Sequence, residues 1–183
     1  MIKNKKILVT GGKGRFARVL KNKNSKLNLY FASKNECNIL NEKSILNAIK
    51  KIKPKIILHT AALSRPMNIH NENINKSIDL NIIGTSNLVK ICSKFNIKII
   101  YFSTSYVYEG TKGNYSENSP VKPFNNYGWS KLGGECAVSM YKNSLILRIT
   151  MTEKPFLHKK AYSNLISNYM FHEDLVKILP KII

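Results

Sequence analysis

The feature that most constrains the fold is a glycine-rich turn directly after the first apolar segment of the chain. Residues 7–10 are apolar or β-branched, residues 11–17 read Gly-Gly-Lys-Gly-Arg-Phe-Ala, and a segment of helical period follows. Gly11 permits a tight turn, and Gly14 lets the backbone come close to a pyrophosphate. The N-terminus of the helix would supply oriented N–H groups and partial positive charge to the phosphates. A strand, a glycine turn and a helix in this order predict a dinucleotide-binding site.

The rest of the chain alternates short β-branched runs with longer segments of helical period, as βαβ units do. We expect strands at residues 6–10, 27–31, 56–59, 97–103 and 145–149. We expect helices at residues 15–21, 42–51, 74–95 and 127–141. This pattern predicts an α/β fold of the Rossmann type, a doubly wound parallel sheet with helices on both faces.

Beyond residue 150 the periodicity weakens. We expect residues 151–164 to form loop with a little helix, followed by an amphipathic piece at 174–183. The predicted organisation is therefore a dinucleotide-binding domain with the catalytic residues at 1–150, and a short C-terminal piece of the substrate-binding region at 151–183.

The formal charge of +20 raises the question of nucleic-acid binding. The lysines are spread along the whole chain, and arginine, the better reader of bases and phosphates, is scarce. We therefore expect attraction of anionic substrates and no specific nucleic-acid partner. The sequence contains no apolar run long enough to predict a membrane span, and its histidines lack metal-ligand spacing, so no metal is expected. Its three cysteines, also without such spacing, favour reduced thiols and a cytoplasmic location.

Selectivity between NAD and NADP is normally decided at the end of the second strand, where an acidic residue binds the ribose diol. Here Ser33 and Lys34 follow that strand, and the first carboxylate is that of Glu36. Ser33 and Lys34, with help from Arg15, suit a 2′-phosphate. NADP(H) is therefore the preferred cofactor. NAD(H) is the alternative, and Lys34 would then be a solvated lysine that contacts no phosphate.

The second informative motif is Tyr127-Gly128-Trp129-Ser130-Lys131. At a spacing of four on a helix, Tyr127 and Lys131 share a face. A nearby ammonium would lower the pKa of the tyrosine from about 10 and make it a useful acid–base group. Lys131 would also reach the ribose of a nicotinamide. Thr104 follows the fourth strand, at the edge where doubly wound sheets bind ligands, and would hold the substrate oxygen that Tyr127 protonates.

Over residues 5–150 the sequence resembles the extended short-chain dehydrogenase/reductase family, in particular dTDP-4-dehydrorhamnose reductase-like and NAD-dependent epimerase/dehydratase proteins. The matching segments are residues 10–17, 59–62, 79–85, 103–110, 115–117, 120–123, 127–135 and 147–150. The resemblance implies Thr104, Tyr127 and Lys131 as the catalytic set. It further implies a cofactor site formed by Gly11, Gly14, Arg15, Phe16, Ser33, Lys34, Asn38, Ile39, Ala61, Ala62, Asn81 and Lys131. Asn38 and Ile39 would lie near the adenine. The helices at 74–95 and 127–141 would form a homodimer, as such a pair commonly does in the family.

The chain departs from the family in two respects. Ser105 and Tyr106 follow Thr104, where dehydratases carry an acidic pair, so dehydration is not expected. Family members also continue much further beyond the fifth strand, so we expect the lobe that binds the nucleotide-sugar to be largely missing. Two functions follow as alternatives. One is an NAD(P)-dependent reductase or epimerase acting on a nucleotide-activated keto-sugar. The other is a non-catalytic or regulatory NADP(H)-binding protein that has lost the substrate domain.

Overall fold

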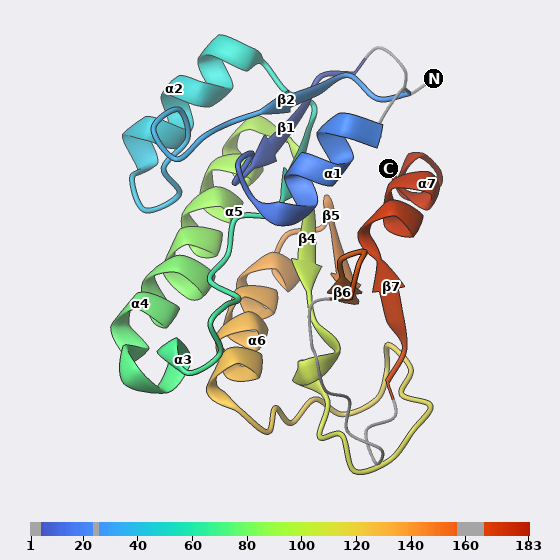
Figure 1. Ribbon diagram of the computed structural model, residues 1–183. Coiled ribbons are helices and arrows are strands. Elements are labelled where there is room, and N and C mark those ends of the chain that lie inside the picture. The colour runs from blue at the N-terminus through green and yellow to red at the C-terminus, as the bar shows by residue number, and fades with distance from the viewer. Residues whose placement is uncertain (1–4, 24–25, 157–166) are drawn as a thin grey trace.

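A five-stranded parallel sheet forms the centre of the computed structural model, which describes residues 5–23, 26–156 and 167–183 (Figure 1). The strands are β1 (Ile7–Thr10), β2 (Leu29–Phe31), β3 (Ile56–His59), β4 (Lys98–Ser103) and β5 (Ser144–Arg148). They lie in the order β2-β1-β3-β4-β5, and every neighbouring pair is parallel. The predicted α/β fold with a doubly wound parallel sheet is confirmed.

The strand order reverses between β1 and β3. The chain passes from β1 to β2 on one side, and then crosses to β3 on the other side of β1. In sheets of this kind the crevice for a ligand lies at the carboxyl ends of the two strands that flank the reversal. Here the glycine turn leaves β1 and residues 60–67 leave β3, so these two loops border the crevice.

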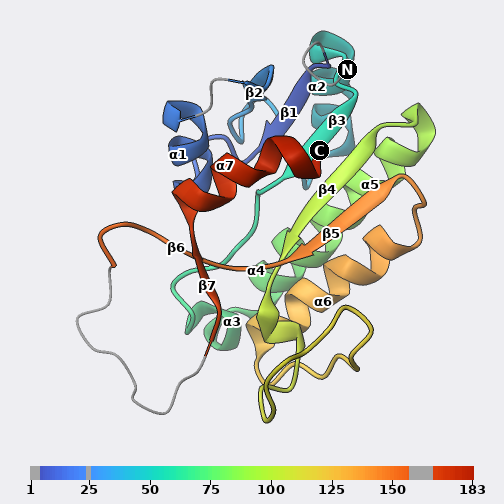
Figure 2. The ribbon, with the colours of Figure 1, turned by 90° about the vertical axis from the view of Figure 1, so that its right-hand side faces the viewer.

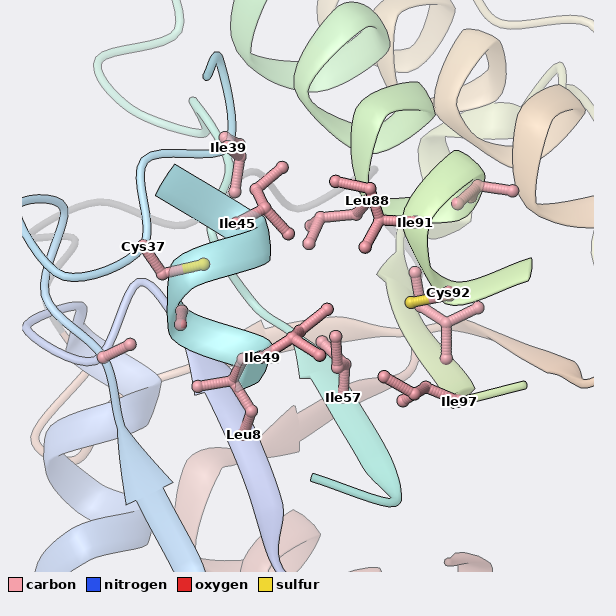
Figure 3. Close-up of a cluster of buried hydrophobic side chains, with 14 of the residues drawn as sticks. Leu8, Cys37, Ile39, Ile45, Ile49, Ile57, Leu88, Ile91, Cys92 and Ile97 are labelled. Carbon is pink, nitrogen blue, oxygen red and sulfur yellow. The ribbon is translucent and has the colours of Figure 1, made fainter. Parts of the chain in front are cut away.

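Helices cover both faces of the sheet (Figure 2). On one face lie α2 (Glu42–Ile52), α5 (Gly84–Phe95) and α6 (Asn126–Ser139), and on the other lie α1 (Arg15–Lys23) and α7 (His172–Ile182). Successive strand residues point to opposite faces, so Leu8 and Ile57 enter the first core and Ile7 and Ile56 enter the second. Figure 3 shows the first core, where residues of α2 and α5 meet those of β1 and β3.

The helix predicted at 74–95 is interrupted by a wider turn. It consists of α4 (Ile74–Ile78), a π-helical segment η1 (Asp79–Ile83) and α5, and the short helix α3 (Ile69–Glu72) precedes it. Single π-helical turns of this kind often occur at functional sites. The wide turn contains Asn81, whose side chain is buried.

The segment after β5 differs from the expected loop. Thr150–Thr152 form β6, which pairs in parallel with β7 (Tyr169–Phe171), whereas residues 157–164 of the expected loop lie outside the described residues. Two strands of three residues each carry no periodicity, and their pairing depends on a contact between distant parts of the chain. The predicted C-terminal helix exists as α7, and its Leu175, Val176 and Leu179 pack into the same core as α1. The division of the chain at residue 150 stays a prediction.

Candidate functional site

A pocket of about 500 Å³ opens at the carboxyl ends of the central strands. Its walls come from the glycine turn, the loop after β3, the end of β4, the start of α6 and the segment around β6 and β7. It brings together seven of the predicted site residues: Gly14, Arg15, Phe16, Ala62, Thr104, Tyr127 and Lys131. Residues from the glycine motif and from the Tyr127–Lys131 motif, more than a hundred positions apart, therefore face one cavity.

The glycine turn is shaped by contacts that exclude larger side chains. Gly11 has a φ of +66°, and a Cβ atom there would lie 2.8 Å from Cα of Ala61. Ala61 therefore packs against the turn from the loop after β3. The ring of Phe16 lies 5.3 Å from that of Phe102 and 5.6 Å from that of His172, within the second core. The side chain of Phe16 therefore belongs to the core, and its backbone N–H, in the first turn of α1, would be the group available to a phosphate.

Tyr127 is enclosed by aromatic rings at the start of α6. Its ring centroid lies 5.1 Å from that of His70 and 5.9 Å from that of Tyr106. Gly128 permits this packing, because a Cβ atom there would lie 2.4 Å from the carbonyl oxygen of Tyr106. Burial raises the pKa of Tyr127, and the hydroxyl of Thr104 partly opposes that rise. The direction is opposite to the lowering expected from Lys131, because desolvation of the phenolate is the largest cause of the shift.

Lys131 is one turn further along α6 and is 2% exposed. Its Nζ lies 4.0 Å from the centroid of the Tyr101 ring, over the ring face. Burial lowers the pKa of Lys131 to about 7, and the charge of Glu135 acts in the opposite direction. The amine therefore titrates close to neutral pH.

Thr104 follows β4 and caps the 3₁₀ turn η2 (Ser105–Val107), where its Oγ1 accepts a hydrogen bond from the backbone N–H of Tyr106 at 3.2 Å. The residue is buried and lines the pocket with Tyr127. Its hydroxyl also hydrogen-bonds to the side chain of Tyr127, which places the two groups together. The role of Thr104 in holding a substrate oxygen stays a prediction.

Asn81 hydrogen-bonds to residues of two other segments that border the pocket. Its Oδ1 accepts from the N–H of Leu63 at 2.8 Å, and its Nδ2 donates to the carbonyl oxygen of Leu63 and to Oγ of Ser130. Ser130 in turn donates to the carbonyl oxygen of Tyr127 at 2.8 Å. Asn81 therefore ties the loop after β3 to α6, and fixes two walls of the pocket relative to each other.

The residues predicted at the end of β2 lie outside the pocket lining. Ser33 donates to Glu36 Oε2 from its backbone N–H at 2.9 Å and from its hydroxyl at 2.7 Å, and Tyr30 donates to Oε1 at 2.6 Å. These hydrogen bonds lower the pKa of Glu36 to about 2. The carboxylate of Glu36 therefore lies beside Ser33, although Glu36 comes three residues later in the sequence. Lys34 is exposed.

Asn38 and Ile39, expected near the adenine, follow in the same turn. The Asn38 side chain accepts from the N–H of Leu40 at 3.1 Å. Ile39 is buried in the first core, where its side chain packs against Gly84. The backbone N–H of Asn38 donates to Oγ of Ser44 at 2.9 Å, and the carbonyl oxygen of Ile39 accepts from Asn87 at 3.1 Å. The position of both residues near the adenine stays a prediction.

Glu135 forms a buried ion pair that anchors α6. Its two carboxylate oxygens accept from Arg148, with a contact of 2.8 Å between Oε2 and the guanidinium. The side chains of Glu135 and Arg148 are 3% and 21% exposed. Arg148 also donates to the hydroxyl of Tyr108 at 3.0 Å, which fixes the segment after β4. Glu135 is thus structural.

Arg65, Glu153 and His172 also line the pocket and belong to none of the motifs. Elsewhere, five lysines surround an open hollow at the amino ends of the strands, which concentrates positive charge away from the pocket: Lys5, Lys6, Lys53, Lys55 and Lys98. Within the described residues, no helix has the length and apolar character to cross a membrane. The same residues contain no group of three or more histidine, cysteine or acidic side chains placed to hold a metal.

Comparisons with known proteins agree with this geometry. The model of the RmlD substrate binding domain family matches residues 5–171. Methionine adenosyltransferase 2 subunit beta of Xenopus laevis is 38% identical over 104 residues, which cover 56% of this chain and 31% of that protein. A dTDP-4-dehydrorhamnose reductase of Aggregatibacter actinomycetemcomitans is 28% identical over 152 residues, which cover 80% of this chain and 51% of that protein. The chain thus spans about half, or less, of these relatives.

Among solved structures, dTDP-4-dehydrorhamnose reductase from Bacillus anthracis, in complex with NADP, superposes with a TM-score of 0.86 at 23% sequence identity. The match covers 97% of this chain and 70% of that one, and establishes the fold. The chain belongs to the RmlD substrate binding domain family.

Proposed function

We propose that this chain binds NADP(H), with NAD(H) as the alternative, and that the dinucleotide lies across the glycine turn with its nicotinamide end toward Lys131. The observation that carries the proposal is the single pocket shared by Gly14, Arg15, Tyr127 and Lys131. The helix N-terminus would receive the pyrophosphate, and Lys131 would hold the hydroxyls of the nicotinamide ribose.

We further propose that the bound dinucleotide serves a regulatory, non-catalytic role. In support, several relatives are named as a subunit of methionine adenosyltransferase, which places members of this family within larger assemblies.

The second candidate is a reductase or epimerase of a nucleotide-activated keto-sugar. It is favoured by the position of Thr104, Tyr127 and Lys131 on one cavity. The dinucleotide would supply or accept the hydride. Tyr127 would give its proton to the carbonyl oxygen of the sugar, while Thr104 would donate a hydrogen bond to the same oxygen. The relative named dTDP-4-dehydrorhamnose reductase supports this candidate.

One assay separates the regulatory role from the reductase. The protein is incubated with NADPH and a panel of nucleotide-linked 4-keto-sugars, and the oxidation of NADPH is followed by absorbance. A regulatory role predicts binding without oxidation above the rate of a Tyr127→Phe variant. Oxidation that the wild-type protein supports and Tyr127→Phe abolishes would contradict the regulatory role and establish the reductase.

We also propose a cytoplasmic homodimer formed through the helices at 74–95 and α6. Apolar side chains on these helices are exposed, among them Ile83 at 44% and Trp129 at 53%. Burial of such a patch would favour association. Light scattering at tens of micromolar should therefore give twice the chain mass, about 42 kDa, from a chain of 20.9 kDa. A strictly monomeric mass would contradict the dimer.

A further inference from the structure

The pocket carries a strong excess of positive charge. Five cationic side chains line it, and among its described lining residues Glu153 is the single carboxylate. The cations are Lys13, Arg15, Arg18, Arg65 and Lys131. A cavity of this composition attracts anions, because its walls also limit screening by solvent.

Glu153 is shared between two of these cations. Its Oε2 lies 3.4 Å from NH1 of Arg15 and 3.9 Å from NH1 of Arg65, and its side chain is 19% exposed. Both distances are long for a charge-assisted hydrogen bond. The carboxylate of Glu153 therefore interacts weakly with two guanidinium groups. The cluster of Arg15, Arg65 and Glu153 keeps one net positive charge.

The two arginines serve different parts of the pocket. Arg15 begins α1 and belongs to the glycine turn, where the phosphates of a dinucleotide would lie. Arg65 comes from the loop after β3, and its charge partly opposes the rise that burial causes in the pKa of Tyr106 and of Tyr127. The charge of Arg15 acts in the same direction on Tyr127 and has no such effect on Tyr106. Arg65 thus acts on the aromatic side of the pocket, beside the residues expected to face a second ligand. A dinucleotide on the glycine turn would engage Arg15 and leave Arg65 with its weak contact to Glu153.

We propose that Arg65 binds a phosphate group of a small molecule that lies beside the dinucleotide, and that this phosphate replaces Glu153 as its partner. The proposal rests on the proposed binding of a dinucleotide, and applies whether the second ligand is an effector or a substrate. A guanidinium pairs with phosphate through two parallel N–H···O bonds, whereas its present contact with Glu153 is single and long. The exchange would therefore strengthen the interaction of Arg65 and set the specificity for phosphate-bearing ligands.

Glu153 would then determine how readily the exchange occurs. It stands directly after β6, and therefore on the segment that follows the five-stranded sheet. Its carboxylate competes with the ligand for Arg65, so removing its charge should favour the ligand. Stronger ligand binding without the charge of Glu153 would identify it as the partner that the phosphate replaces. Weaker binding would identify it as a residue that helps to bind the phosphate.

The test is calorimetric titration of the full chain, saturated with NADPH, with inorganic pyrophosphate and with dTDP. Arg65→Gln should weaken the binding of these anions by about tenfold or more, as expected for loss of a charge-assisted contact. Glu153→Gln should strengthen it severalfold. Arg18→Gln removes a charge from the same pocket outside the Glu153 cluster, and should change binding by about twofold at most if Arg65 is specific. Binding of both anions would identify phosphate as the recognised group, and binding of dTDP alone would add recognition of the nucleoside.

Two results would overturn the inference: anion binding unaffected by Arg65→Gln, or equal losses in Arg65→Gln and Arg18→Gln. Absence of binding for both anions to protein that binds NADPH would also overturn it, while leaving the proposed function in place. If NADPH itself does not bind, the proposed function fails. The anion titrations are then made on the protein alone, where the same dependence on Arg65 decides whether the phosphate site exists.

Discussion

The amine of Lys131 rests on the face of the Tyr101 ring, with 4.0 Å between Nζ and the ring centroid. Tyr101 belongs to β4 and also donates a hydrogen bond from its hydroxyl to the carbonyl oxygen of Lys131 at 3.2 Å. Tyr101 thus contacts both the backbone and the side chain of Lys131, in a buried part of the pocket. Cation–π attraction stabilises the ammonium there, but burial costs more, and the pKa of Lys131 falls to about 7.

Lys131 should therefore make the stability of the protein depend on pH between about 7 and 10. In the unfolded chain its pKa is near 10.4, so between the two values the unfolded state binds more protons and the free energy of unfolding rises with pH. Below pH 7 the full cost of the buried charge is present. Lys131→Met removes this contribution. Between pH 7 and 9.5 the free energy of unfolding of wild type should therefore rise by a few kcal/mol more than that of the variant, given about 1.4 kcal/mol per pKa unit.

Urea titrations at pH 7 and 9.5 measure this difference. Lys122→Met is the matched control, because Lys122 is an exposed lysine whose side chain is 72% accessible. The control should keep the pH dependence of wild type. Equal pH dependence in wild type and Lys131→Met would show that the lysine is not desolvated.

The ion pair between Glu135 and Arg148 should contribute far more to stability than the exposed pairs. Glu135→Gln keeps the shape of the side chain but leaves the partly buried guanidinium of Arg148 without its counterion. Loss of one partner of a buried pair typically costs about 3–5 kcal/mol of unfolding free energy. Glu109→Gln breaks an exposed pair with Lys122, and should lower the free energy of unfolding far less, because solvent screens that pair. Urea denaturation of both variants tests the contrast, and similar losses would argue against a structural role for Glu135.

The choice between NADP and NAD should depend on opposing charges at the end of β2. Lys34 would attract a 2′-phosphate, whereas the carboxylate of Glu36, held at Ser33, would repel it. The pKa of Glu36 is about 2, so this carboxylate is charged at any pH near neutral. Glu36→Gln should therefore raise the affinity for NADPH relative to NADH, and Lys34→Glu should lower it.

Fluorescence titrations with both dinucleotides give the ratio of the two affinities. An exposed charge acting on a phosphate at moderate salt is expected to change the ratio by about threefold to tenfold. A ratio that neither substitution changes would place the 2′ position of the ribose elsewhere.

The sequence was informative where local pattern and chain topology agree. Buried parallel strands are continuous apolar runs, such as residues 56–59, and the glycine turn directly follows the run at residues 7–10. The sheet and the edge that carries the pocket can therefore be predicted from residues that are neighbours in the sequence. The contact between Arg65 and Glu153 joins residues 88 positions apart, on two loops without periodicity. The pairing of β6 with β7 has the same character. The π-helical turn at Asn81 likewise leaves no trace in an apolar pattern that continues through it.

The central claim, that the glycine turn holds a dinucleotide, is tested most directly by calorimetric titration of NADPH and NADH into wild type, Gly14→Val and Gly113→Val. Gly14 lines the pocket, and a Cβ atom there would lie 3.0 Å from the carbonyl oxygen of Gly11, whereas a Cβ atom at Gly113 would meet nothing within 4 Å. We predict one dinucleotide per chain for wild type and Gly113→Val, and no measurable binding to a folded Gly14→Val. Failure of wild type to bind either dinucleotide at millimolar concentration, or full binding by Gly14→Val, would contradict the claim.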